Sequence, residues 1–192
     1  MNSKNMKISP SETELALLRK LIGNTFEFIG GYSLPDFLTS DVIVIATDEI
    51  AIKVSGDIFE AEIEGYPENY SKVKITELTD AQVRILRASG EIYPRGSGLV
   101  VQDVSLVTRT TSEFKNGMQT WSIESLRAIV LNLGSTNLIV SRLGDHDEVL
   151  AASFVKNFSF SSLPSVSNYL EEDLETKYEF TETSFSLFEN NG

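Results

Sequence analysis

The chain has 192 residues, with 28 acidic and 16 basic side chains, a formal net charge of -12, one histidine and no cysteine. The missing cysteines exclude disulfides, thiolate nucleophiles and cysteine-ligated zinc, and a single histidine excludes any site that needs two imidazoles. The negative charge opposes binding to nucleic acid or to an anionic membrane, because both present phosphates that need a cationic protein face. The longest apolar run, Val42–Ala46, is far too short to cross a bilayer, and residues 1–10 lack the apolar stretch of a signal peptide.

The first predicted element is a helix that opens at a capping box, Ser11–Glu14. In this motif the serine hydroxyl accepts a hydrogen bond from the glutamate amide, and the glutamate side chain reaches back to the serine amide. Apolar residues then recur at helical spacing from Leu15 to Ile22, and Gly23 can end the helix.

Strands follow this helix. Val42–Ala46 is apolar on both faces, which is typical of a central strand, and a turn at residues 47–49 leads into the alternating pattern of Ile50–Val54. This pattern predicts the first hairpin of a sheet.

A second pair of alternating segments carries acids on one strand and lysines on the other. With a loop at residues 65–70, the register that faces both apolar sets inward puts Glu62 opposite Lys74 and Glu64 opposite Lys72. Each cross-strand charge pair contributes only about 0.2–1 kcal/mol, so the acidic row is interpreted as a solvated strand face.

The next segment predicts a helix and then a long hairpin. A capping box, Thr79–Gln82, opens the helix, and Gly90 can end it. Asn116-Gly117 is the preferred pair for a two-residue type I′ turn, and its arms are residues 99–115 and 118–133. A shorter hairpin, with strands at Leu138–Val140 and Val149–Phe154, comes after it.

Residues 156–192 are acidic and rich in aromatic side chains. After Pro164, apolar residues at helical spacing predict a third helix that extends to Lys177. We expect this segment to dock on the body of the protein as a helix plus one or two strands.

Together these patterns predict an α+β fold, built mainly on antiparallel hairpins with about three helices, as a single domain over residues 1–192. Two sheets and one strongly bent sheet both fit the patterns.

The densest cluster of ligand-type side chains is Asp145, His146, Asp147 and Glu148. Carboxylates and an imidazole at one turn could hold a divalent cation or carry out acid–base chemistry. Four consecutive residues converge only if the loop curls, so a polar hairpin turn is the simpler interpretation.

The loop at residues 93–98 is rich in glycine and contains Arg95, while Arg84 and Arg87 lie three residues apart on the second predicted helix. Exposed loop amides and guanidinium groups can bind a phosphate or a carboxylate. The spacing matches neither a P-loop nor a dinucleotide-binding motif, and an ordinary loop is the alternative.

No catalytic motif is readable, so we expect a cytoplasmic, acidic and non-enzymatic interaction protein, of the inhibitor or immunity type, that binds a basic partner. Two alternatives remain: a metal-dependent enzyme or binder that uses residues 145–148, and a small-anion binder that uses Arg95. Apart from a possible divalent cation, no cofactor is expected.

Overall fold

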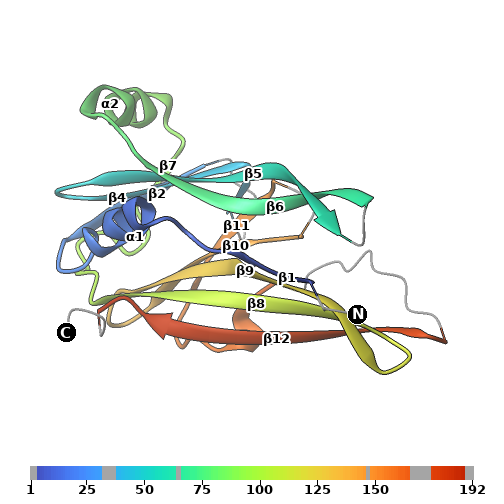
Figure 1. The fold of residues 1–192 in the computed structure, drawn as a ribbon. Coiled ribbons are helices and arrows are strands. Elements are labelled where there is room, and N and C mark those ends of the chain that lie inside the picture. Colours follow the sequence, from blue (N-terminus) through green and yellow to red (C-terminus); the bar gives the residue numbers. More distant parts are fainter. Residues whose placement is uncertain (1–3, 32–37, 64–65, 146–147, 165–173, 189–192) are drawn as a thin grey trace.

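The computed structural model describes residues 4–31, 38–63, 66–145, 148–164 and 174–188. Within these residues the chain forms two β-sheets that lie face to face, two α-helices and one short 3-10 helix, η1 (Phe160–Ser162) (Figure 1). Neither of the two described α-helices has the length and apolar composition needed to span a membrane. The sequence left open two sheets or one strongly bent sheet, and the structure has two sheets.

The larger sheet has seven strands among the described residues, in the spatial order β12-β8-β9-β10-β11-β3, with β1 also beside β9. These strands are β1 (Lys4–Ile8), β3 (Leu38–Ser40), β8 (Asp103–Lys115), β9 (Met118–Asn132), β10 (Asn137–Arg142), β11 (Leu150–Val155) and β12 (Thr176–Ser186). The pair of β1 and β9 is parallel, and the other pairs of this sheet are antiparallel. Because β1 pairs with residues 121–125 of β9 and β10 with residues 128–132, β1 and β10 lie end to end along one edge of β9.

The smaller sheet has five strands in the described part of the chain, all antiparallel, in the order β6-β5-β4-β2-β7. They are β2 (Phe26–Gly30), β4 (Val42–Thr47), β5 (Ala51–Ile63), β6 (Tyr66–Glu77) and β7 (Ile92–Tyr93). Strand β4 pairs on both sides, as the apolar run Val42–Ala46 predicts for a central strand.

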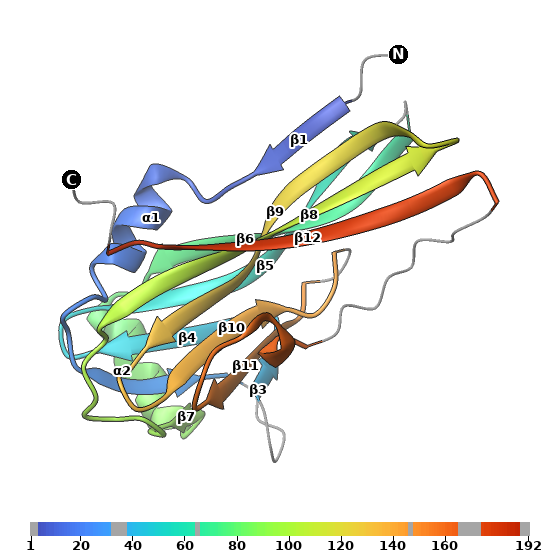
Figure 2. The ribbon, with the colours of Figure 1, turned by 90° about the horizontal axis from the view of Figure 1, so that it is seen from below.

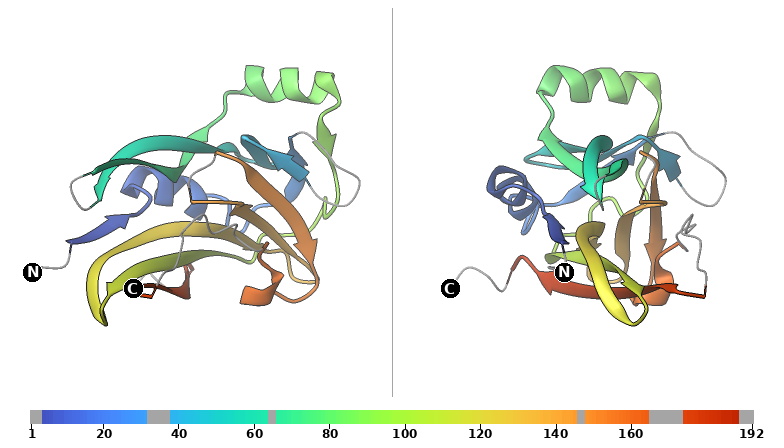
Figure 3. Two further views of the ribbon diagram at one scale, coloured as in Figure 1. Left: turned by 90° about the vertical axis from the view of Figure 1, so that its right-hand side faces the viewer. Right: turned by 45° about the vertical axis from the view of Figure 1, so that its right-hand side comes forward.

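A continuous apolar core fills the space between the two sheets. It combines Leu18 of α1 (Glu12–Arg19), Ile45 of β4 and Leu131 of β9, each completely buried. The second helix, α2 (Asp80–Ser89), lies across the opposite face of the smaller sheet (Figure 3). There Leu86 packs against a separate apolar cluster that contains Phe28.

Local signals place the two helices. Both predicted capping boxes are present, because the Ser11 and Thr79 side chains accept hydrogen bonds from the amides of Glu14 and Gln82. Helix α1 ends at Arg19, one turn before the predicted stop at Gly23. Gly90 ends α2 with a φ of 77°, in the left-handed region that favours glycine.

The mainly antiparallel α+β fold is confirmed, but the expected count of about three helices is slightly too high for the described residues. Most of the third predicted helix falls on residues 165–173, which lie outside the described part. Its predicted end at Lys177 is wrong, because Thr176 and Lys177 open strand β12. Pairing with β8 supplies these residues with main-chain partners, and this outweighs the helical spacing of the apolar side chains before them.

The predicted register of the acid–lysine hairpin is also wrong. Strand β6 begins at Tyr66, so Lys72 lies opposite Asp57 and Lys74 opposite Ser55, not opposite the glutamates. The register places Phe59 opposite Tyr70, and their rings meet edge to face with centroids 6.4 Å apart. An aromatic pair therefore takes the place of the predicted charge ladder.

The long hairpin forms as predicted. Its turn residues, Asn116 and Gly117, have φ values of 51° and 76°, and two positive φ angles are what a type I′ turn requires. Strands β8 and β9 flank this turn, and β10 and β11 form the shorter hairpin that follows.

Candidate functional site

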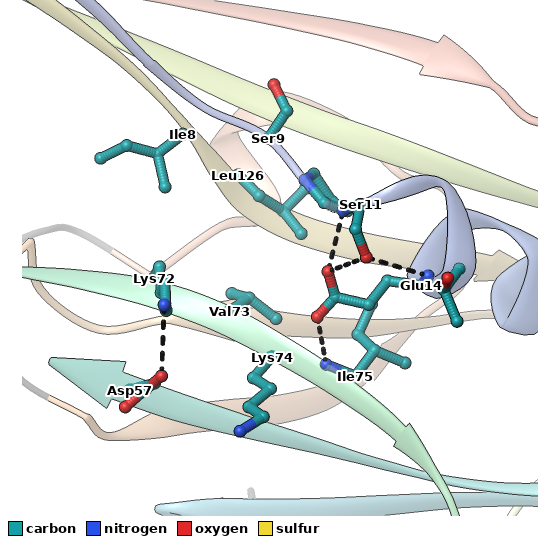
Figure 4. A pocket seen from close by; sticks show the side chains of 12 residues that line it. Ile8, Ser9, Ser11, Glu14, Asp57, Lys72, Val73, Lys74, Ile75 and Leu126 are labelled. Atoms are coloured by element: carbon teal, nitrogen blue, oxygen red, sulfur yellow. Dashed lines mark hydrogen bonds and ion pairs between the residues drawn. The ribbon is translucent and has the colours of Figure 1, made fainter. Parts of the chain in front are cut away.

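A cavity of about 450 Å³ lies between the first residues of the chain and strand β6 (Figure 4). Ile8, Val73 and Leu126 supply apolar side chains, and hydroxyl and charged groups complete the lining. The full lining is Ile8, Ser9, Pro10, Ser11, Thr13, Glu14, Asp57, Lys72, Val73, Lys74, Ile75 and Leu126. This volume falls in the range of small-molecule sites.

Glu14 ties the helical side of this cavity to its strand side. One carboxylate oxygen, Oε2, accepts hydrogen bonds of 2.8 Å from the Ser11 amide and from the Ser11 hydroxyl. The other, Oε1, accepts a 2.8 Å bond from the amide of Ile75 on β6 (Figure 4). A single side chain thus caps α1 and also occupies a main-chain donor on the edge of the smaller sheet.

These contacts set the ionisation of Glu14. Partial burial raises the pKa of Glu14, but the hydrogen bonds from Ile75 and Ser11 outweigh it, so its pKa lies below the ordinary value of 4.5. Because the pKa is lowered in the folded state, the carboxylate stabilises the fold above pH 4.5. This stabilisation is lost as the pH falls through the folded-state value.

We expect Glu14→Gln to lower the free energy of unfolding by about 1 kcal/mol at pH 7, since a charge-assisted acceptor is replaced by a neutral one. The difference from the wild type should shrink as the pH falls below 4.5, which urea unfolding at a series of pH values measures. Glu12→Gln removes the same charge from the first turn of the same helix, where the Glu12 side chain is exposed, and should leave the unfolding midpoint almost unchanged. Equal effects of the two substitutions at pH 7 would contradict this role of Glu14.

A second concavity, which we call the acidic groove, has a volume of about 310 Å³ and lies between α2 and the turn that joins β4 to β5. It is lined by Glu27, residues 46–51, Glu77, Leu78, Asp80, Val83, Arg84 and Arg87. Five carboxylates therefore face two guanidinium groups, with Asp48 and Glu49 supplied by residues 46–51. The groove carries an excess of negative charge.

Part of this charge is already engaged. Arg87 pairs with Glu27, the Asp48 carboxylate accepts a 2.8 Å hydrogen bond from the Thr25 amide, and Lys20 lies 3.5 Å from Glu77. Glu49 and Asp80 are exposed, and the structure shows no described cation paired with either. These two carboxylates are available to an incoming positive charge.

The three arginines predicted to bind an anion do not share one site. Arg84 and Arg87 line the acidic groove, and Arg87 also lies over the Phe28 ring with its guanidinium carbon 5.1 Å from the centroid. Arg95 is exposed and lies over the ring of Phe154, also at 5.1 Å, and is absent from the lining of the groove. The pairing of Arg87 with Glu27 and the surrounding carboxylates make the groove a poor environment for an anion.

The predicted metal ligands are only partly described. Asp145 is buried, and its carboxylate lies 3.1 Å from Nη2 of Arg142. Glu148 is exposed, while His146 and Asp147 lie outside the described residues. Within the described residues, no group of three or more histidine, aspartate or glutamate side chains could hold a metal ion. A metal site at residues 145–148 stays a prediction.

Sequence reasoning missed three buried arginines in the larger sheet: Arg109, Arg127 and Arg142. Arg142 donates to the Ser71 carbonyl at 2.7 Å, to the Ser125 hydroxyl at 2.6 Å and to Asp145. These bonds join β10 of one sheet to β6 of the other.

Arg127 is buried as completely as Arg142, with a relative exposure of 1%. It lies at a β-bulge, because the neighbouring residues Leu126 and Ala128 pair with consecutive residues of β8 and leave Arg127 without a cross-strand partner. Burial, and then the charges of Arg142 and Arg109, lower its pKa to about 10. The sequence does carry a signal for the burial of Arg127, since this cationic residue interrupts an otherwise apolar strand. The pattern does not identify the residue that pairs with Arg127.

Compared with models of protein families, with curated proteins and with solved structures, the chain matches none of them. Function is therefore argued from the geometry of these sites.

Proposed function

We propose that the protein is a non-enzymatic interaction protein, of the inhibitor or immunity type, that binds a basic protein partner through the acidic groove. The observation that supports this most strongly is the set of five carboxylates around one concavity, of which Glu49 and Asp80 have no described cationic partner. A lysine or arginine side chain of a partner complements such a groove in charge, and long-range attraction by the net charge of -12 speeds its approach.

The position of α2 favours protein binding over capture of a free cation. This helix packs on the sheet through one side only, no residue of α2 is fully buried, and Ile85 is 70% exposed. An apolar side chain next to a charged groove offers the mixture of apolar contact and charge pairing found in protein interfaces.

The test uses a fluorescent oligo-lysine peptide as the probe and compares two doubly substituted variants of equal net charge. We expect Glu49→Gln with Asp80→Asn to weaken binding of the peptide roughly two- to thirtyfold at low salt, because each of the two exposed pairs contributes about 0.2–1 kcal/mol. The control, Glu60→Gln with Glu91→Gln, removes two exposed carboxylates outside the groove and should bind nearly as the wild type does.

Salt supplies the second readout. Binding at the groove should weaken steeply as sodium chloride is raised, because exposed charges are screened over about 8–10 Å at physiological ionic strength. Equal losses in the two variants would show that the peptide senses only the net charge, and the proposed groove would then be wrong.

The proposal places the protein in the cytoplasm and assigns it no cofactor. Its support is compositional, because a chain without cysteine suits a reducing compartment. Two alternatives were a metal ion at residues 145–148 and an anion at Arg95. The contacts among the described residues give no support to either.

A further inference from the structure

The cavity beside Glu14 contains a short stretch of open main chain on β6. The amides of Ser71 and Ile75 point away from β5, because they donate to the Asp145 carbonyl and to the Glu14 carboxylate. Residues two apart in an antiparallel strand direct their main-chain groups to the same side, and the ladder of β5 and β6 runs without a register shift. The N–H and C=O of Val73, between these two residues, therefore also point outward, where Val73 lines the cavity.

The N–H and C=O of Val73 have no hydrogen-bond partner among the described residues. On one side of them both main-chain groups of Ser71 are bonded, and on the other Glu14 accepts from the amide of Ile75. One donor and one acceptor of a single residue match the C=O and N–H of one further amino-acid unit. A longer strand is blocked at both neighbouring positions.

The wall opposite β6 is apolar. Strand β1 lies beside β9 and leads into α1 (Figure 2), so Ile8 at the end of β1 and Leu126 of β9 lie across the cavity from Val73 (Figure 4). Leu126 is 3% exposed and belongs to the core between the sheets. The cavity of about 450 Å³ therefore offers an apolar surface to a small molecule that is bound at the strand edge.

The charged residues of the lining leave Lys74 without a partner. The Glu14 carboxylate already accepts three hydrogen bonds, and Lys72 lies 3.4 Å from Asp57. Lys74 is exposed, forms no ion pair with a described residue, and points away from Glu14 (Figure 4). Its flexible stem allows the ammonium group to follow a carboxylate at the mouth of the cavity.

We propose that this cavity binds a small N-acyl amino acid with an apolar side chain, at a site separate from the acidic groove. The N–H of the ligand donates to the Val73 carbonyl and a carboxylate oxygen accepts from the Val73 amide, as in one residue pair of an antiparallel ladder. Directly opposed side chains lie on the same face of a sheet, so the apolar group of the ligand reaches Ile8 and Leu126. The negative charge lies near Lys72 and Lys74, which flank Val73.

The experiment is a titration of the isotope-labelled full chain with N-acetyl-leucine, followed by NMR. We expect a Kd of about 1 mM or lower and a change in the chemical shift of the Val73 amide. A chain that shows no binding at about 10 mM N-acetyl-leucine, or binding that leaves the Val73 amide unchanged, overturns the proposal.

Two analogues separate the contacts of the ligand. The first, 4-methylpentanoate, keeps the carboxylate and the branched chain but has no N–H, so it leaves the Val73 carbonyl unpaired and should bind at least about fivefold more weakly. The second, N-acetyl-leucinamide, keeps the N–H and the C=O but has no charge, and it should bind up to about fivefold more weakly. Binding of 4-methylpentanoate as tight as that of N-acetyl-leucine would contradict the pairing with Val73.

Substitutions at Val73 test the main-chain contact from the side of the protein. Val73→Pro removes the outward N–H and leaves the ladder to β5 intact, and we expect it to weaken binding of N-acetyl-leucine at least about fivefold relative to Val73→Ala. Val73→Ala is the matched control, because it also shortens the side chain but keeps the N–H. Equal affinities of the two folded variants would exclude the Val73 amide as a donor to the ligand.

A second pair of variants tests the charge and carries the test if Val73→Pro does not fold. Lys74→Met removes the unpaired cation of the cavity and should weaken binding of N-acetyl-leucine by up to about fivefold, while binding of N-acetyl-leucinamide stays unchanged. Lys156→Met removes an equal charge from an exposed position outside the cavity and should bind both compounds as the wild type does. If Lys74→Met and Lys156→Met bind N-acetyl-leucine equally well, the carboxylate does not lie at this cavity.

Discussion

Replacement of Arg142 by methionine is expected to lower the free energy of unfolding by about 3–5 kcal/mol, the largest effect of any change considered for this protein. The Arg142 side chain is 1% exposed and bonds at once to the Ser71 carbonyl, the Ser125 hydroxyl and the Asp145 carboxylate. Methionine fills similar space but donates nothing, so a buried carboxylate and two further acceptors lose a donor.

The size of the loss depends on the charge left behind at Asp145. The free energies of unfolding of Arg142→Met, Asp145→Asn and the double variant, measured in urea, form a double-mutant cycle. This cycle isolates the interaction free energy between Arg142 and Asp145. We expect the double variant to recover at least about half of the stability lost in Arg142→Met, because a neutral amide tolerates burial better than an unpaired carboxylate.

Arg95→Met is the matched control for Arg142→Met. It removes an exposed guanidinium that lies over a single ring, and it should cost no more than about 1 kcal/mol. If Arg142→Met and Arg95→Met lowered the free energy of unfolding by similar amounts, the buried hydrogen bonds of Arg142 would not stabilise the contact between the sheets.

The features predicted correctly from sequence are those whose causes are local. A capping box needs only residues three apart, as at Ser11 and Thr79, and a type I′ turn needs only the two residues Asn116 and Gly117. The apolar run of β4 likewise predicts that both faces of this strand are buried, and this prediction needs no knowledge of distant residues.

The features that sequence reasoning missed depend on partners far apart in the chain. Glu14 was recognised as a helix cap, but its bond to Ile75 spans 61 residues and has no signature in either segment. Arg142 is similar, because it reaches the Ser71 carbonyl of β6 only after the two sheets have packed. The acidic groove is assembled from four parts of the chain, namely β2, the turn between β4 and β5, the end of β6 and α2, and none of them alone indicates a groove.

The contacts of Arg142 lie at the junction of the two sheets, because they join β10 of the larger sheet to Ser71 of β6. Tyr70 lies there as well, and burial, with the charge of Asp145, raises its pKa to about 12. Apolar packing holds the sheets together elsewhere, whereas at this junction a specific set of hydrogen bonds fixes how they meet.

Gly56→Ala should destabilise the protein by about 3 kcal/mol, although alanine is normally the better residue within a strand. A Cβ atom at Gly56 of β5 would lie 2.2 Å from the carbonyl oxygen of Glu148 and 2.5 Å from its Cα atom. Both are main-chain atoms of the segment that leads into β11, so no side-chain rotation relieves the clash and the two sheets must move apart.

Gly30→Ala gives the comparison, because a Cβ atom there first meets the tip of the Leu86 side chain, at 2.9 Å, and that tip can turn away. The nearest main-chain atom, the Glu91 carbonyl oxygen, lies 3.3 Å away, where a shift of a few tenths of an ångström suffices. The cost of Gly30→Ala should stay below about 1 kcal/mol when the two variants are unfolded in urea side by side. Equal stabilities would mean that main-chain contact at Gly56 does not limit the separation of the sheets. A large loss confined to Gly56→Ala would instead show that the smaller sheet is held at van der Waals distance from the chain entering β11, which is the distance that lets Asp145 and Arg142 reach Ser71.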